Sequence, residues 1–228
     1  MTARKSTEDL EKTSAIIRVV RKLSGLTQNE FKNRIGAKQS TVSKWEKGIL
    51  IPSMSQWFKM SDEFLFDSES TFKLGILDHC RPAGSKNAYS ENVFRLPYRY
   101  FEQRGTAVRA LQPFFKYFST SLGEKALKHF LEAKKIDRDL FYVFDYPVSV
   151  QLTFDLIAAL IEKGAIKNNN LHKLTTPLSK PETHGKLRDK YLPTRNQKEL
   201  VSTILTHAGF YDVNFYYEIL EENQNEIV

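Results

Sequence analysis

The chain has 228 residues, of which 41% are hydrophobic, and its net charge is +7. That length allows one small domain and one of medium size. No apolar run approaches the roughly 18 residues of a membrane span, and residues 1–9 are too polar for a signal peptide. A single cysteine, Cys80, excludes an internal disulfide framework. These features predict a cytoplasmic protein that is not associated with a membrane.

The positive charge is concentrated at the start of the chain. Residues 1–60 contain 12 Lys and Arg against 5 Asp and Glu, whereas residues 61–228 contain 22 of each kind. A solvated helix surface alone could account for a basic stretch. A polyanionic partner becomes the better explanation if the same residues also carry a motif that reads nucleic acid.

Such a motif is indicated at residues 26–48, which predict two short helices joined by a tight turn. Thr27 and Glu30 have the spacing of a capping box, so the first helix should begin directly after Thr27. Gly36 ends that helix because glycine adopts a left-handed turn readily. The second helix is predicted over residues 38–47.

Both helices have an apolar side. Phe31 and Ile35 share one face of the first helix, and Val42 and Trp45 share the face of the second that should point back toward them. The opposite face of the second helix is then left outward, and it is formed by Gln39, Ser40, Ser43 and Lys44. Short hydroxyls, an amide and a lysine in one outward row are typical of a surface that reads DNA.

Residues 12–66 resemble the helix-turn-helix domain of the lambda Cro and repressor family, also called the XRE family. The matching residues are Gln28, Phe31, Ile35, Gly36, Val42, Trp45, Glu46, Gly48, Ile51, Pro52 and Ser53. One departure is Lys32, because the family has a small residue there, at the close contact between the two helices. Lys32 should extend its side chain past that contact.

The resemblance implies a double-stranded DNA partner, with the second helix in the major groove and Gln28 on a phosphate. By their hydrogen-bonding groups, Gln39 suits adenine, and Lys44 suits guanine or a phosphate. The predicted DNA-binding residues are Gln28, Lys38, Gln39, Ser40, Thr41, Ser43, Lys44 and Lys47.

The fold class predicted is a mainly α N-terminal helix-turn-helix domain of five short helices, over residues 1–79, plus a C-terminal α+β domain. Besides the two helices above, the N-terminal domain should contain helices over 7–24, after a cap at Ser53, and over 70–79. Residues 80–90 combine Pro, Gly, Ser and Asn without apolar periodicity, which predicts a linker.

The C-terminal domain, residues 91–228, is predicted from its aromatic and apolar patterns. Its expected elements are a strand over 93–101 broken at Pro97, helices over 106–118, 123–134, 137–144 and 149–162, a loop over 164–194, a helix over 195–207, a strand over 210–220 and a hairpin turn over 221–225. A strand that late would pair with residues beyond Val228, so the chain is predicted to be truncated at its C-terminus.

Residues 104–164 resemble, more loosely, the N-terminal effector domain of AraC-type regulators, which implies a sensing or dimerising role. The aromatic residues between Phe94 and Phe118 either fill a core or wall a pocket for a small apolar ligand. The apolar residues Leu152, Leu156, Leu160 and Phe114 to Phe118 exceed what one modest core needs. This surplus predicts a homodimer.

Catalysis is not indicated. The five histidines have no metal-ligand spacing, and phosphate-binding loops and nucleophile motifs are missing. Asp137, Asp139 and Asp145 are expected to be helix caps and solvated surface rather than an acid and base pair. The sequence therefore predicts a DNA-binding transcription regulator, not an enzyme, with no metal and no cofactor.

Three alternatives stay open. The chain could be an antitoxin-like module that binds a partner protein through residues 85–228, or an enzyme with an appended DNA anchor. A phage-type repressor is the third, although the Ser-Lys protease of the self-cleaving kind is not found in the sequence.

Overall fold

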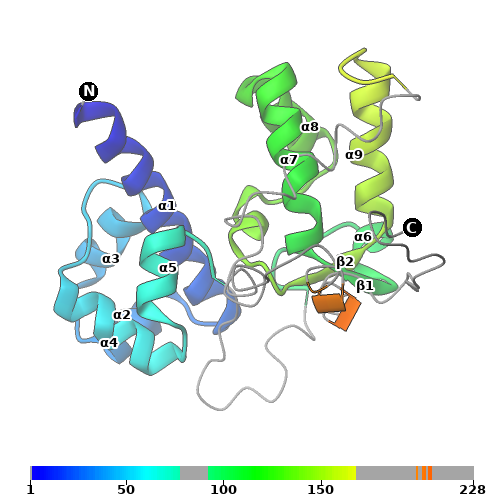
Figure 1. The fold of residues 1–228 in the computed structure, drawn as a ribbon. Coiled ribbons are helices and arrows are strands. Elements are labelled where there is room, and N and C mark those ends of the chain that lie inside the picture. Colours follow the sequence, from blue (N-terminus) through cyan, green and yellow to red (C-terminus); the bar gives the residue numbers. More distant parts are fainter. Residues whose placement is uncertain (1, 78–91, 168–198, 200–201, 204, 207–228) are drawn as a thin grey trace. The chain divides into compact units, whose positions relative to one another are not determined.

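The computed structural model describes residues 2–77, 92–167, 199, 202–203 and 205–206 (Figure 1). Several predicted elements lie wholly or mostly outside these residues. They are the linker over 80–90, most of the loop over 164–194 and of the helix over 195–207, the strand over 210–220 and the turn over 221–225.

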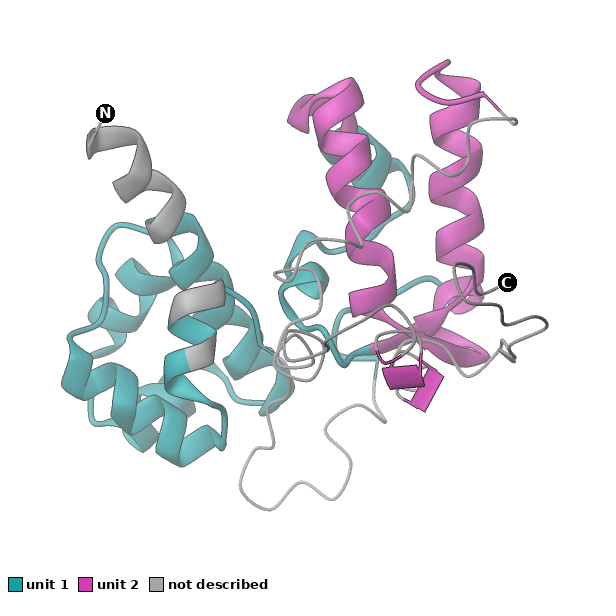
Figure 2. Cartoon of the chain, viewed as in Figure 1, with its two compact units in different colours: residues 1–97, 128–146 teal, residues 98–127, 147–228 magenta. Residues whose placement is uncertain are grey.

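The chain forms two compact units (Figure 2). The first unit comprises residues 1–97 and 128–146, and the second comprises residues 98–127 and 147–228. The predicted division at residues 80–90 stays a prediction, since residues 78–91 are not described. The first unit is discontinuous in sequence, so a segment distant from the N-terminus contributes to its core.

Five helices open the first unit, as the sequence predicted. They are α1 (Thr2–Leu23), α2 (Gln28–Ile35), α3 (Gln39–Glu46), α4 (Met54–Phe64) and α5 (Ser68–Leu74). The expectation that all five are short is wrong for α1, which is 22 residues long. The expected fifth helix over 70–79 begins and ends earlier than predicted.

The predicted capping signals are present. The Thr27 hydroxyl accepts from the backbone N–H of Glu30, whose carboxylate accepts from the Thr27 N–H in return. Hydrogen bonds from the Thr27 backbone and hydroxyl lower the pKa of Glu30. Gly36 ends α2 with φ of 66°, in the left-handed region. The cap of α4 at Ser53 is confirmed as well.

The core of the helix-turn-helix segment is formed by the side chains that the sequence placed there. Phe31 and Ile35 of α2, and Val42 and Trp45 of α3, are all buried. Phe31 stacks on Phe64 of α4 with ring centroids 5.0 Å apart. Burial of each such side chain stabilises the fold by roughly 1.5 to 3 kcal/mol, so these contacts fix how α3 lies on α2.

The strand predicted over residues 93–101 is wrong. The side chain of Asn92 accepts from the Leu96 N–H at 2.6 Å and donates to the Leu96 carbonyl at 2.7 Å, which folds the chain into a turn. Pro97 lacks the N–H that a paired strand needs. The helix α6 (Tyr98–Phe101) follows at once, in the second unit.

Residues 128–146 bring a second part of the chain into the first unit. The helix α8 (Glu124–Ala133) ends there, and the 3-10 helix η1 (Arg138–Tyr142) follows, capped by Asp137 as predicted. The Leu77 N–H donates to the Tyr142 carbonyl at 2.7 Å, and the Leu77 carbonyl accepts from the Phe144 N–H at 2.8 Å. These bonds anchor η1 beside the residues that follow α5.

Besides α6, the described part of the second unit contains a small antiparallel sheet and two longer helices. The sheet is formed by β1 (Arg104–Ala107) and β2 (Pro147–Ser149), and the helices are α7 (Val108–Leu122) and α9 (Gln151–Glu162). Thr106 pairs with Val148 in the sheet. The predicted helix over 106–118 therefore starts too early, and β2 was missed because three residues are too few to show alternation.

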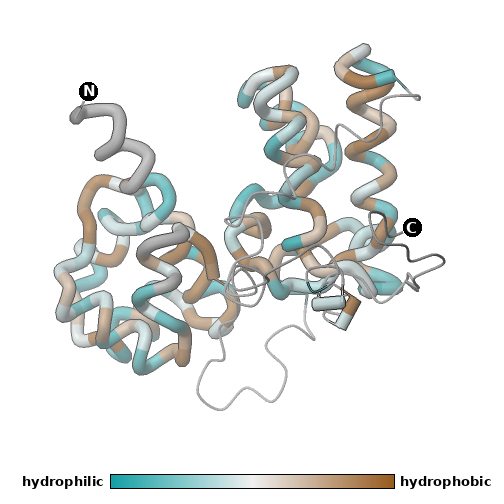
Figure 3. The backbone as a smooth tube through the Cα atoms, in the orientation of Figure 1, coloured by the Kyte–Doolittle hydropathy of each residue, from teal (hydrophilic) through white to brown (hydrophobic). Residues whose placement is uncertain are grey.

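Most of the apolar side chains predicted to be surplus are buried within the chain. Leu152, Leu156 and Leu160 form one stripe of α9 and are fully buried, and Phe115 and Phe118 of α7 are buried too. Figure 3 shows hydrophobic and hydrophilic residues alternating along these helices. The stripe thus does not supply a dimer face.

Candidate nucleic-acid interface

The predicted DNA-binding residues are accessible. Lys38, Gln39, Ser40, Lys44 and Lys47 are exposed, and Gln28, Thr41 and Ser43 are half-buried. Seven of them lie on α3 or on its two capping residues, and Gln28 begins α2. Their binding to DNA stays a prediction.

The other face of α3 is held in the core. Val42 and Trp45 are buried, and so is Glu46, the last residue of the helix. Residues spaced by three and four share one side of a helix, so burial of this stripe leaves the polar row outward. Local packing therefore decides which side of α3 is left accessible.

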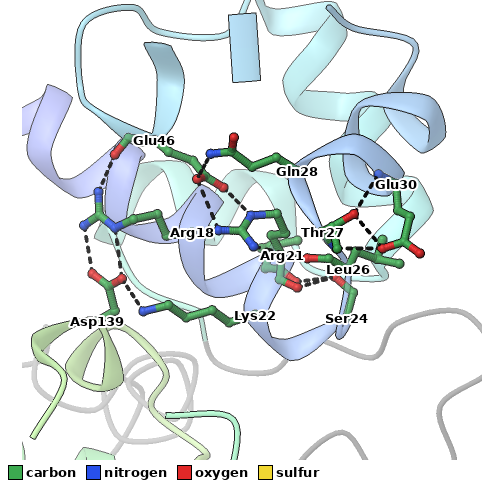
Figure 4. A network of polar contacts seen from close by, with 11 residues as sticks. Arg18, Arg21, Lys22, Ser24, Leu26, Thr27, Gln28, Glu30, Glu46 and Asp139 are labelled. Atoms are coloured by element: carbon green, nitrogen blue, oxygen red, sulfur yellow. Dashed lines mark hydrogen bonds and ion pairs between the residues drawn. The ribbon is translucent and has the colours of Figure 1, made fainter. Parts of the chain in front are cut away.

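Glu46 binds the first two helices together (Figure 4). Its Oε1 accepts from Arg21 Nε at 2.5 Å, and its Oε2 accepts from Gln28 Nε2 at 2.7 Å and from Arg21 Nη2 at 3.2 Å. The Gln28 amide has two N–H groups, and one bond to Glu46 leaves the other to donate elsewhere. Glu46 thus orients the residue expected on a phosphate.

Arg18 of α1 joins the end of α3 to η1. Its Nη1 donates to the Glu46 carbonyl oxygen at 2.6 Å, while Nε and Nη2 donate to the two carboxylate oxygens of Asp139 at 2.9 and 2.8 Å. The hydrogen bonds that Arg18 donates to Asp139 raise the pKa of Arg18.

Asp139 also accepts from Lys22 Nζ at 2.9 Å, and Lys22 forms an ion pair with Asp137 as well. Burial alone would raise the pKa of Asp139, but hydrogen bonds from Arg18 and Lys22 outweigh it and lower the pKa. Stabilisation from these contacts is therefore complete above the ordinary aspartate pKa and is lost as the pH falls through the lowered one.

Asp139 had been expected on the solvated surface, and this is wrong, because the residue is only 6% exposed. The role of Glu46 could have been found in the sequence. Glu46 lies four residues after Val42, in the buried stripe of α3, and a buried carboxylate needs a cationic partner. The pairing of Arg18 with Asp139 joins residues 121 positions apart. No local pattern indicates such a pair.

Residues 17–64 match the family model described as helix-turn-helix. This segment is a Cro and repressor-like helix-turn-helix, from a family of DNA-binding transcription regulators. No curated protein and no solved structure matched the chain. The resemblance of residues 104–164 to AraC-type regulators lies outside the matched segment and stays a prediction.

Within the described residues, His, Cys, Asp and Glu side chains do not gather in threes that could hold a metal ion. Among the helices formed by those residues, none is long and apolar enough to cross a membrane.

Proposed function

We propose that the chain binds specific sites on double-stranded DNA by laying α3 in the major groove, and that it regulates transcription there. One observation carries this proposal: the polar row of α3 is accessible while the opposite stripe is locked in the core. The outward residues would meet base edges and the flanking phosphates.

Individual roles follow from hydrogen-bonding capacity. The exposed amide of Gln39 can donate to and accept from adenine, and Lys44 can donate to guanine or to a phosphate. Gln28 would use its remaining N–H on a phosphate, with its orientation set by Glu46. Phosphate contacts fix the register of α3, and base contacts supply specificity.

Gln39→Ala should lower affinity for the preferred DNA site by about 1 to 3 kcal/mol and leave binding to random duplex nearly unchanged. Gln28→Ala should weaken binding to both. The preferred site is first selected from a random duplex library with the full chain, and affinities are then measured by fluorescence anisotropy.

The exposed α2 residue Asn33 provides the control, because Asn33→Ala removes an amide outside the predicted contact row. Equal losses on selected and random duplex for Gln39→Ala would mean that α3 reads DNA through another face. If the wild-type chain enriches no sequence at all, the proposed function itself is wrong.

We propose that two copies act together, since one short helix reads few base pairs and a two-fold pair can occupy two half-sites. Exposed apolar side chains in the connection from α3 to α4 and in α4 itself support this. They are Ile49, Leu50, Ile51, Met54 and Phe58. Their burial between two copies would remove apolar surface from water.

Sedimentation of the full chain at tens of micromolar should give about twice the monomer mass of 26.4 kDa. Phe58→Lys should shift the chain toward monomer, because it places a charge in the proposed contact. Lys125→Glu, a charge change in α8, should leave the mass unchanged. A wild-type chain that sediments at 26.4 kDa, free and on DNA, would contradict the pairing.

A further inference from the structure

The last turn of α3 depends on a side chain from α1. The final carbonyls of a helix have no partner within it and must be satisfied by other groups. Backbone N–H groups of residues 47–49 donate to the carbonyls of residues 43–45. The next carbonyl, that of Glu46, accepts from Arg18 Nη1. A guanidinium at this end also suits the negative pole of the helix dipole.

Asp139 fixes the orientation of that guanidinium. Two parallel bonds from Nε and Nη2 of Arg18 to one carboxylate leave a single orientation of the group, in which Nη1 points to the Glu46 carbonyl. Asp139 is in turn anchored, because its own N–H donates to Asp137 at 2.9 Å and η1 is bound to Leu77.

We propose that Asp139 is a positioning residue for DNA reading, acting through Arg18 on the end of α3 and, through Glu46, on Gln28. This inference rests on the function proposed above. Asp139 lies far beyond residues 17–64, the segment that matches the helix-turn-helix family. The geometry of the reading helix is therefore set partly by a segment outside that motif.

Loss of Asp139 should lower the affinity for a preferred DNA sequence more than the affinity for random duplex. Arg18, with its side chain 32% exposed, would keep its charge but lose the partner that aims it. Base contacts require α3 to be placed accurately, whereas binding to random duplex depends chiefly on charge. The ratio of the two affinities therefore reports positioning and is insensitive to partial unfolding, which lowers both alike.

The test uses the full chain, a duplex of the sequence that the wild type selects, and a random duplex. Asp139→Asn should lower affinity for the selected duplex by about tenfold, a typical size for coupling between sites, and change random binding less than twofold. Glu132→Gln is the matched control: it removes the same charge from the same unit at a side chain 63% exposed, and it should change neither affinity.

A second variant covers the case in which Asp139→Asn does not fold. Arg18→Lys keeps the charge but cannot bind Asp139 with two parallel bonds and reach the Glu46 carbonyl as well. It should show the same loss of specificity. If the aspartate variant folds, the double variant should lose no more than either single variant, because both break one contact.

Three results would overturn the inference: Asp139→Asn behaving like Glu132→Gln, Arg18→Lys retaining full specificity, or additive losses in the double variant. Each of these results is distinct from failure of the proposed function. If the proposed function fails, the wild-type chain itself will not prefer any duplex sequence.

Discussion

Trp45→Ala should unfold the helix-turn-helix segment. Trp45 is 2% exposed and lies against the core on the inner face of α3. Truncating a buried tryptophan costs about 3 to 5 kcal/mol, which is a large share of the roughly 5 to 15 kcal/mol that stabilises a typical domain. Urea unfolding of the full chain, followed by circular dichroism, should show a helical transition shifted to much lower denaturant.

Lys44→Ala is the control for this experiment, because Lys44 precedes Trp45 but is exposed on the outer face. It should unfold like the wild type and affect only DNA binding. A Trp45→Ala chain that stays fully folded and loses base discrimination alone would reverse the assignment of the two faces of α3.

Binding to duplex DNA should fall steeply with salt. Residues 1–60 hold the whole excess of positive charge, and we expect about four to six phosphates to be neutralised, which gives a slope of log K against log salt of roughly −4 to −5. Between 50 and 200 mM salt the affinity should then drop about 250-fold to 1,000-fold. Fluorescence anisotropy on a random duplex measures this directly.

Replacing single lysines tests which side chains contribute to the salt dependence. Lys38→Ala and Lys44→Ala should each reduce the slope by about one if these side chains meet phosphates. Lys128→Ala, at an exposed position of α8, should leave the slope unchanged. An affinity that stays constant over this salt range would show that the cations of the first unit do not face the DNA backbone.

Local signals in the sequence were sufficient for the helix-turn-helix. Thr27 and Glu30 form their capping box, Gly36 takes the left-handed turn, and Val42 and Trp45 are buried. Each of these depends on residues a few positions apart, within the reach of capping and helical periodicity. The positions that define the candidate interface could therefore be predicted from the sequence.

Other parts could not be predicted, because they depend on residues far apart in the sequence or on segments of only a few residues. The aromatic residues over 93–101 suggested a strand, but the Asn92 turn prevails there. The strand β2 becomes recognisable only through its partner β1. Asp139 looks like any acidic residue near a helix start until the fold brings Arg18 beside it.

The discontinuous first unit has a consequence during synthesis of the chain. Residues 1–97 emerge from the ribosome first, yet η1 and its neighbours, which complete that unit, follow only with residues 128–146. The backbone N–H and carbonyl of Leu77 can form their hydrogen bonds to Tyr142 and Phe144 only after those two residues have been synthesised. A nascent chain can therefore form α1 to α5 early, but the bonds from Arg18 to Asp139 form only after residues 98–127, the first segment of the second unit, have been made.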